Sequence, residues 1–166
     1  MAEKNFLNQL SGATAGKKQS QNSPWNTFLG TLDNYQLSDK DAMTLFARTL
    51  AVAKSDWKDS HGNTLLMHMA GRGRTAIVRR LIKELYANIY AVNEEGMSAL
   101  HMAARAGYKD TCEELIKAGA NPWVKNQNGD TPAMLAKYNK HDEISDFLRI
   151  QQIEQAHRAQ QQSYSK

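Results

Sequence analysis

The side chains best suited to chemistry in this chain are five histidines, one cysteine and several adjacent carboxylates. Zinc sites combine His and Cys ligands at short, regular spacings, and none of the histidines has such a spacing with a third ligand nearby. The lone Cys112 excludes an internal disulfide, and its place in an apolar helical pattern favours packing over catalysis. Glu94 and Glu95 are adjacent only in sequence, which does not make an acid–base pair. We therefore expect no catalytic, cofactor-binding or metal-binding residue and no enzyme activity.

The elements that carry these residues follow a repeated phrase, found at residues 62–70, 96–104 and 129–136. Its leading glycines, at positions 62, 96 and 129, are 34 and 33 residues apart, a period typical of stacked units. Each phrase predicts a polar turn and then a short helix capped by Thr64, Ser98 or Thr131. Glycine closes the first two of these helices at positions 73 and 107. Lys140 takes that place in the third, where we expect a less favourable turn.

A second, apolar helix follows in each unit, and the whole pattern resembles the ankyrin-repeat family. The family phrase is nearly complete in residues 93–125 and partial in residues 59–92 and 126–148. The resemblance implies an all-α solenoid of stacked helix–turn–helix units. It also implies that His101 ties neighbouring turns together by hydrogen bonds. Met67 and Met134 occupy the same repeat position as His101 and are expected in the core. Met97 is expected on an exposed turn.

The predicted organisation has four parts. Residues 1–22 read as a disordered polar tail, and residues 23–58 as an N-terminal helical cap that begins at Ser23 and Ser38. Residues 59–150 form the repeat domain, with a C-terminal helical extension before a Gln-rich tail at residues 151–166. No apolar run approaches the length of a membrane helix, and the first ten residues do not resemble a signal peptide. We therefore expect a monomeric, cytoplasmic protein, and export by a route without a cleaved signal peptide stays open.

The resemblance implies a non-catalytic adaptor that binds a protein or peptide through turn tips and exposed positions of the first helices. Arg72, Arg105 and Tyr138 are the expected hot spots, because Arg and Tyr carry much of the energy in many interfaces. The full set of expected partner-binding residues is His61, Arg72, Glu94, Glu95, Met97, Arg105, Gln127, Tyr138 and Asn139.

Two alternatives stay open. Small ankyrin-type proteins with polar tails resemble translocated effectors or secretion-associated factors of intracellular bacteria. The other alternative is a nucleic-acid or phosphoinositide binder, because residues 59–92 hold five Lys or Arg against two Asp or Glu. Its cation cluster would be Arg72, Arg74, Arg79 and Arg80. The net charge of +4 is concentrated in that repeat and the N-terminal tail, which argues against a basic stripe over several units.

Overall fold

The computed structural model describes residues 23–35, 37–50 and 57–163, and every regular element among them is an α-helix. The chain divides into two compact units, Met1–Leu65 and Leu66–Lys166. The polar tail expected at residues 1–22 lies outside the described residues.

The first unit holds α2 (Pro24–Tyr35) and α3 (Asp39–Leu50), which pack against each other. Both begin where the sequence predicts, because Ser23 and Ser38 accept hydrogen bonds from backbone N–H groups of the first helical turn. Trp25, Phe28 and Phe46 form the core, with ring centroids 5.7 to 6.0 Å apart. α2 and α3 therefore form a helical pair with its own aromatic core.

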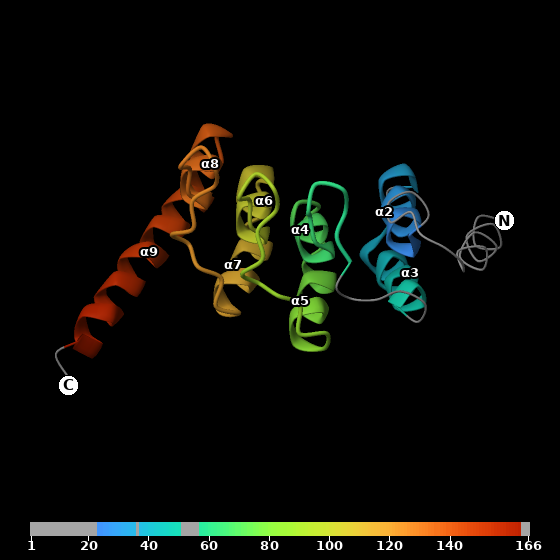
Figure 1. The fold of residues 1–166 in the computed structure, drawn as a ribbon, viewed down its shortest axis with the longest axis horizontal. Coiled ribbons are helices and arrows are strands. Elements are labelled where there is room, and N and C mark those ends of the chain that lie inside the picture. The colour runs from blue at the N-terminus through green and yellow to red at the C-terminus, as the bar shows by residue number, and fades with distance from the viewer. Residues whose placement is uncertain (1–22, 36, 51–56, 164–166) are drawn as a thin grey trace. The chain divides into compact units, whose positions relative to one another are not determined.

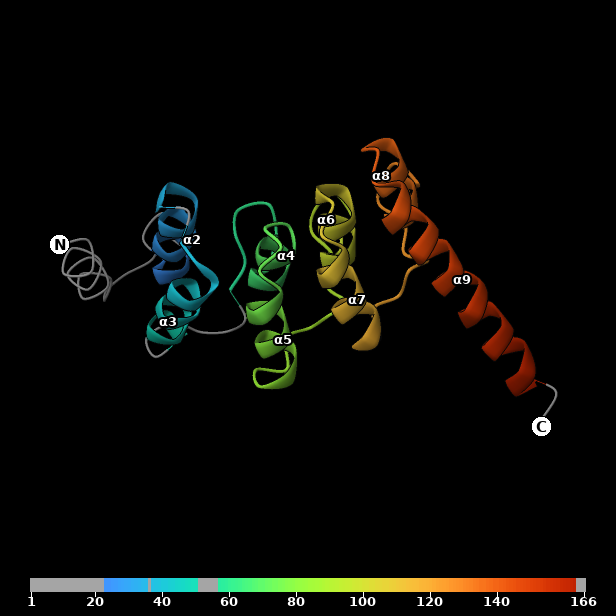
Figure 2. The same ribbon diagram turned by 180° about the vertical axis from the view of Figure 1, so that it is seen from behind.

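The second unit is a row of three helical pairs, which lie side by side in both views (Figures 1 and 2). The pairs are α4 (Leu65–Ala70, counted in this unit from Leu66) with α5 (Thr75–Lys83), α6 (Ala99–Ala106) with α7 (Lys109–Lys117), and α8 (Pro132–Tyr138) with α9 (Asp142–Ser163). Neighbouring pairs contact each other through α6 and α8 and through α5 and α7. The all-α solenoid expected from the resemblance is confirmed.

The apolar positions of the repeated phrase form the core of this unit. The buried side chains of the second helices include Ile77, Val78, Leu81, Cys112, Leu115, Ile144 and Leu148. They recur three or four residues apart, so each helix turns one stripe toward its neighbours. Met67 is also buried, as expected.

Capping follows the predicted plan in the second and third repeats. The Ser98 hydroxyl and the His101 ring form a reciprocal capping box at the start of α6, and Thr131 caps α8. Gly107 ends α6 with a left-handed φ of 85°. Lys140 adopts the same conformation after α8, with φ 64°, which is uncommon for a residue with a side chain. The less favourable turn expected there is present.

The last helix extends well past the repeat. It runs without interruption to Ser163, so the boundary expected at residue 150 does not coincide with the end of an element. Gln152, which is buried, donates a hydrogen bond of 2.8 Å to the Pro122 carbonyl and holds the helix against the preceding loop. The helical extension is therefore joined to the repeats by a buried polar contact.

Candidate partner-binding surface

Each turn tip is organised by one Asn or Asp side chain. Asn93 Oδ1 accepts hydrogen bonds from the backbone N–H groups of Glu95 and Met97. Asn126 Oδ1 does the same for residues 128 and 130, and Asp59 Oδ1 does so for residues 61 and 63 in the first unit. The tips are therefore turns whose backbone is held in place by these bonds.

The second and third tips are directly linked. The Gln127 backbone N–H donates to the Glu95 carbonyl at 2.9 Å, and its side-chain amide donates to the Glu94 carbonyl. Gly96 lies so close that an added Cβ would approach the Gln127 nitrogen to 3.0 Å. Gln127 thus holds neighbouring tips together, while the carboxylates of Glu94 and Glu95 belong to exposed residues.

His101 supplies a second link between these turns, as the resemblance implies. Its Nδ1 accepts a hydrogen bond from the Ser98 backbone N–H at 3.1 Å, so the proton of the neutral ring lies on Nε2. Nε2 in turn donates to the Asp130 carbonyl of the next tip at 3.1 Å. Burial lowers the pKa of His101, and the bond to Asp130 offsets this only in part. The ring is therefore a neutral structural link.

Two methionines do not lie where the sequence placed them. Met97, expected on an exposed tip, is only 3% exposed, and its sulfur contacts the Asn126 amide at 3.5 Å. The next tip covers it, so it cannot offer a surface to a partner. Met134, expected in the core, is 40% exposed. His101, at the same repeat position, is covered by the following turn, whereas α8 is followed by a short link and the long helix α9.

The C-terminal turns of α4, α6 and α8 are stacked through aromatic rings. A Cβ added at Gly73 would come within 2.4 Å of the Tyr108 ring, and one at Gly107 within 2.5 Å of the His141 ring. Each ring comes from the following repeat and lies on the glycine of the one before. Residues 71–74, 105–108 and 138–141 therefore form one continuous surface, here called the turn row.

The turn row carries four of the predicted partner-binding residues: Arg72, Arg105, Tyr138 and Asn139. Arg105 and Tyr138 occupy the same repeat position and are exposed, Tyr138 at 62%. The Arg105 Nη2 lies 3.5 Å from the Met102 sulfur, so the side chain folds back along α6. An arginine and a tyrosine are thus side by side on neighbouring helices that pack together.

Arg72 and Asn139 have a further role that the sequence analysis missed. Each donates a side-chain hydrogen bond to the carbonyl four residues earlier, Arg72 to His68 at 3.2 Å and Asn139 to Leu135 at 2.8 Å. Both carbonyls lie near the end of a helix, where backbone donors become scarce, although the Leu135 carbonyl also accepts from the Asn139 backbone N–H at 3.2 Å. Arg72 and Asn139 occupy the same repeat position, and this feature of the sequence could have indicated their common role.

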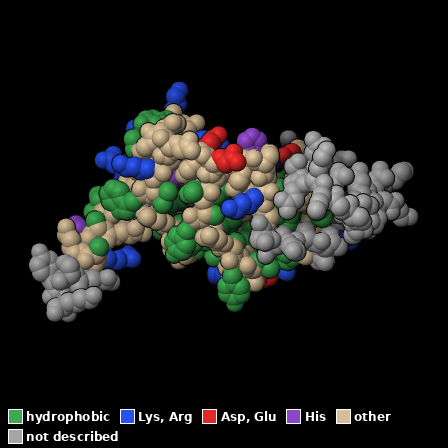
Figure 3. All heavy atoms as spheres, in the orientation of Figure 1, with side chains coloured by type: hydrophobic (Ala, Val, Ile, Leu, Met, Phe, Trp, Pro, Cys, Tyr) green, Lys and Arg blue, Asp and Glu red, His purple; other side chains and the backbone are tan. Residues whose placement is uncertain are grey.

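Acidic and basic side chains occupy different places on this unit. Figure 3 shows the acidic side chains of this face close together over α6 and Lys or Arg side chains around α8. Glu94 and Glu95 lie on the tip before α6, whereas Arg105 is the seventh of the eight residues of α6, near its far end. His61 belongs to the first unit and is exposed. The predicted site therefore consists of an acidic tip, a basic turn row and one separate residue.

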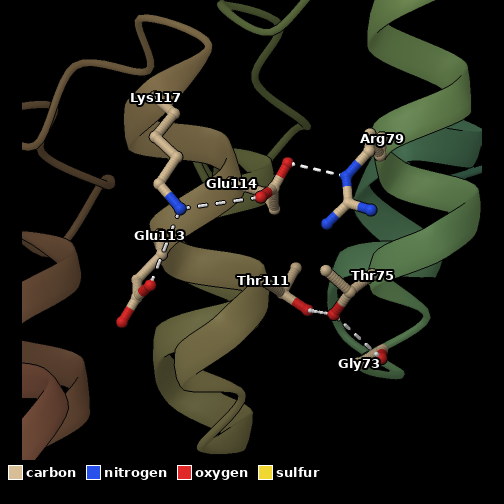
Figure 4. Close-up of polar contacts among 7 residues, drawn as sticks. All are labelled: Gly73, Thr75, Arg79, Thr111, Glu113, Glu114 and Lys117. Atoms are coloured by element: carbon tan, nitrogen blue, oxygen red, sulfur yellow. Dashed lines mark hydrogen bonds and ion pairs between the residues drawn. The ribbon is translucent and has the colours of Figure 1, made fainter.

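The four arginines of the proposed nucleic-acid cluster lie on different elements. Arg72 and Arg74 follow α4, whereas Arg79 and Arg80 lie on α5. Arg79 Nε pairs with Glu114 of α7 at 3.0 Å, which lowers the pKa of Glu114 (Figure 4). Arg80 pairs with Glu84 at 2.6 Å. Two of the four charges are thus matched by carboxylates, Glu114 on α7 and Glu84 directly after α5.

The residues that could have supported other chemistry are accounted for within the described part of the chain. No group of three or more His, Cys, Asp or Glu side chains there could hold a metal ion. Cys112 is fully buried, and burial raises the pKa of its thiol to about 12, which disfavours a reactive thiolate. None of the described helices combines the length and the apolar character needed to cross a bilayer.

The sequence of residues 39–126, slightly more than half of the 166 residues, matches the family described as ankyrin repeats (3 copies). The chain belongs to the ankyrin-repeat family. The matched region of this ankyrin-repeat protein includes α3 at its start and ends at the third turn tip. Ankyrin repeats generally mediate interactions between proteins.

Similar curated proteins are much longer than this ankyrin-repeat chain. Diacylglycerol kinase zeta of Rattus norvegicus is 33% identical over 96 residues, which are 57% of this chain and 10% of that protein. SH3 and multiple ankyrin repeat domains protein 2 of Homo sapiens is 33% identical over 89 residues, 53% of this chain and 5% of that protein. Synphilin-1 of Mus musculus is 32% identical over 89 residues, 51% of this chain and 9% of that protein. The chain thus spans a tenth or less of each of these three relatives.

Proposed function

We propose that this ankyrin-repeat unit is a non-catalytic adaptor that binds a protein or peptide partner across its turn row and tips. The observation that carries the proposal is the exposure of Arg105 and Tyr138 on the neighbouring helices α6 and α8. Both are exposed, both lie at one repeat position, and they stand on helices whose backbones are fixed by capping and stacking. A scaffold whose backbone is already fixed does not have to be ordered on binding, which lowers the cost of association. Exposed Arg and Tyr side chains can then contribute much of the binding energy.

The test compares the natural chain with an Arg105→Ala/Tyr138→Ala variant in affinity purification from the native cell. The variant should lose captured proteins that the natural chain retains. The matched control, Glu113→Ala/Lys117→Ala on α7, removes two half-exposed or exposed side chains away from the turn row and should retain them. Equal capture by both variants would contradict the assignment of the site.

Arg72 is left out of this variant for a structural reason. Its guanidinium donates to the His68 carbonyl, so its removal leaves a helix-end acceptor without that donor. A triple variant that includes Arg72→Ala is therefore expected to lose some stability, and a loss of binding would have two explanations. Arg105 and Tyr138 make no such bond to a helix-end carbonyl in the described residues.

Export from a bacterial cell stays a separate prediction. Deletion of residues 154–166 would remove the last part of α9 but leave Gln152 and its bond to Pro122 in place. The truncated chain should therefore stay folded, so that a loss of export could be separated from a loss of binding.

A further inference from the structure

We propose that the partner segment crossing the turn row is an acidic peptide segment in an extended conformation. This inference rests on the proposed function and names the chemistry of the partner at the same surface. It starts from the composition of the three stacked turns, which read Gly-Arg-Gly-Arg, Arg-Ala-Gly-Tyr and Tyr-Asn-Lys-His. They contain four Lys or Arg and no Asp or Glu.

The cations of the last two turns lack carboxylate partners. Among the described residues, Arg105 and Lys140 form no ion pair, and the Arg105 Nη2 lies 3.5 Å from the Met102 sulfur. The carboxylates nearest to Lys140 in the sequence, Asp142 and Glu143, are each paired with another lysine instead. Two cations are therefore available for an anionic ligand, beside the exposed face of Tyr138.

Stacking brings these cations close together. His141, directly after Lys140, lies on Gly107, two residues after Arg105. The His141 ring therefore packs directly on the backbone of the preceding turn, which brings the two turns close together. Arg72 extends the row on the preceding repeat, where Gly71 approaches Met102 so that an added Cβ would lie 3.5 Å from the Met102 Cβ.

The role of cations at helix ends accounts for only part of this pattern. A basic side chain in the last turn of a helix offsets the partial negative charge there, and Arg72 does so through the His68 carbonyl. Arg105 instead folds along the exposed side of α6 toward Met102. Lys140 follows the end of α8 and is exposed. Their positions suit an external anion better than a helix end.

The repeat spacing indicates an extended chain rather than a helix. Axes of packed helices are about 8–10 Å apart. An extended chain in the polyproline II conformation has three residues per turn and advances about 3.1 Å per residue, so every third side chain lies on one face about 9 Å from the last. A carboxylate at every third residue of such a chain would therefore meet successive turns of the row. The acidic tip, with Glu94 and Glu95, would repel such a segment and keep it at the other end of the inner helices.

The experiment uses the full chain and three labelled probes. They are a 12-residue peptide with Glu at every third position among Gly and Ser, the same peptide with Gln in place of Glu, and a 12-nucleotide single strand. Binding is measured by fluorescence anisotropy at low salt, and the contact surface by amide chemical-shift changes. The Glu peptide should bind and shift residues 105–108 and 138–141, whereas the Gln peptide should bind at least about tenfold more weakly.

The site variant is Arg105→Gln/Lys140→Gln, and its matched control is Lys117→Gln/Lys125→Gln, which removes two charges from exposed residues elsewhere. The site variant should weaken Glu-peptide binding about five- to tenfold and the control less than twofold. Equal losses of Glu-peptide affinity in the two variants would show that binding depends only on the net charge of the chain, and would overturn the proposal. Tighter binding of the nucleotide strand at the same residues would overturn it in favour of nucleic acid.

The two proposals fail differently. If the Arg105→Ala/Tyr138→Ala variant loses its cellular partner but the Glu peptide does not bind, the adaptor function stands and the acidic partner is wrong. If the Glu peptide binds at the turn row but cellular capture is unaffected by that variant, the acidic site stands and the adaptor assignment is wrong. A thermal melt of each variant, expected to match the natural chain within about 2 °C, confirms that folding is intact.

Discussion

Residues 107 and 140 occupy one position in successive repeats, and we predict that substitutions there change stability in opposite directions. Gly107 has φ 85° and lies under the His141 ring, whereas Lys140 has φ 64° and an exposed side chain. Gly107→Ala should therefore destabilise the stack through both the backbone and the ring. Lys140→Gly should stabilise it, because glycine adopts this conformation without a steric penalty.

The magnitudes follow from the two contributions. A left-handed φ costs an L-residue about 1–2 kcal/mol, and forcing a methyl group into a packed contact costs about 1–3 kcal/mol. Gly107→Ala should thus lower the free energy of unfolding by about 2–5 kcal/mol. Lys140→Gly recovers only the backbone part and makes the unfolded chain more flexible, so the net gain should be about 0.5–1 kcal/mol.

Urea unfolding followed by circular dichroism at 222 nm measures both changes. In a Gly107→Ala/His141→Ala double variant the ring is gone, so the added methyl group should cost only the backbone part, and the cycle isolates the clash. Lys140→Ala is the control for charge: it keeps the unfavourable φ and should give no gain. A Gly107→Ala protein as stable as the natural one, or a gain from Lys140→Ala equal to that from Lys140→Gly, would refute this reasoning.

Three further predictions concern buried groups. Because the pKa of His101 is lowered in the folded protein, the unfolded chain takes up this proton first as pH falls, so stability is full above about pH 6.5 and decreases toward the folded pKa. The urea midpoint should therefore fall between pH 7.5 and pH 5, and His101→Gln should flatten this slope. An unchanged slope in the variant would contradict the role of the ring. A pKa of about 12, against an ordinary value of 9.0, leaves the Cys112 thiol with roughly a thousandfold less thiolate. Labelling of this thiol at pH 8 should therefore require local opening of the protein, and its rate should increase in urea. Labelling as fast as that of a free peptide would contradict the burial of Cys112. The buried Thr111 hydroxyl lies 2.7 Å from the Thr75 hydroxyl (Figure 4). Thr111→Val should therefore lower the free energy of unfolding by about 1 kcal/mol, whereas Thr111→Ser keeps the hydrogen bond. Equal stability of Thr111→Val and the natural chain would show that the bond contributes nothing.

Much of the local structure could be predicted because its causes are local. Ser38, Ser98 and Thr131 mark helix starts by bonding backbone N–H groups two or three residues away, and the structure confirms each start. Positive φ at Gly107 and the strain at Lys140 likewise follow from the residue and its repeat position. The role of His101 came from the family resemblance, since its second partner, Asp130, is 29 residues away.

The candidate site was predictable only in part, because exposure depends on what lies over a residue. Met97 belongs to a turn tip, yet the next tip covers it. Met134 shares a repeat position with buried His101, yet α9 continues as a helix where a further turn would be needed to cover it. The Tyr138 side chain is exposed, in agreement with its predicted place on the inner helix.

By itself, the sequence determined that the chain forms helical repeats, where their helices begin and which apolar stripes they bury, because capping, turn geometry and periodicity act over a few residues. Tertiary structure alone decided that Tyr108 and His141 lie on the glycines of the preceding repeat and that Gln152 reaches Pro122. It also decided which cations meet carboxylates and which do not. Except for the local pair Arg80–Glu84, these contacts join residues about 30 or more positions apart, and their geometry depends on how whole repeats pack against each other.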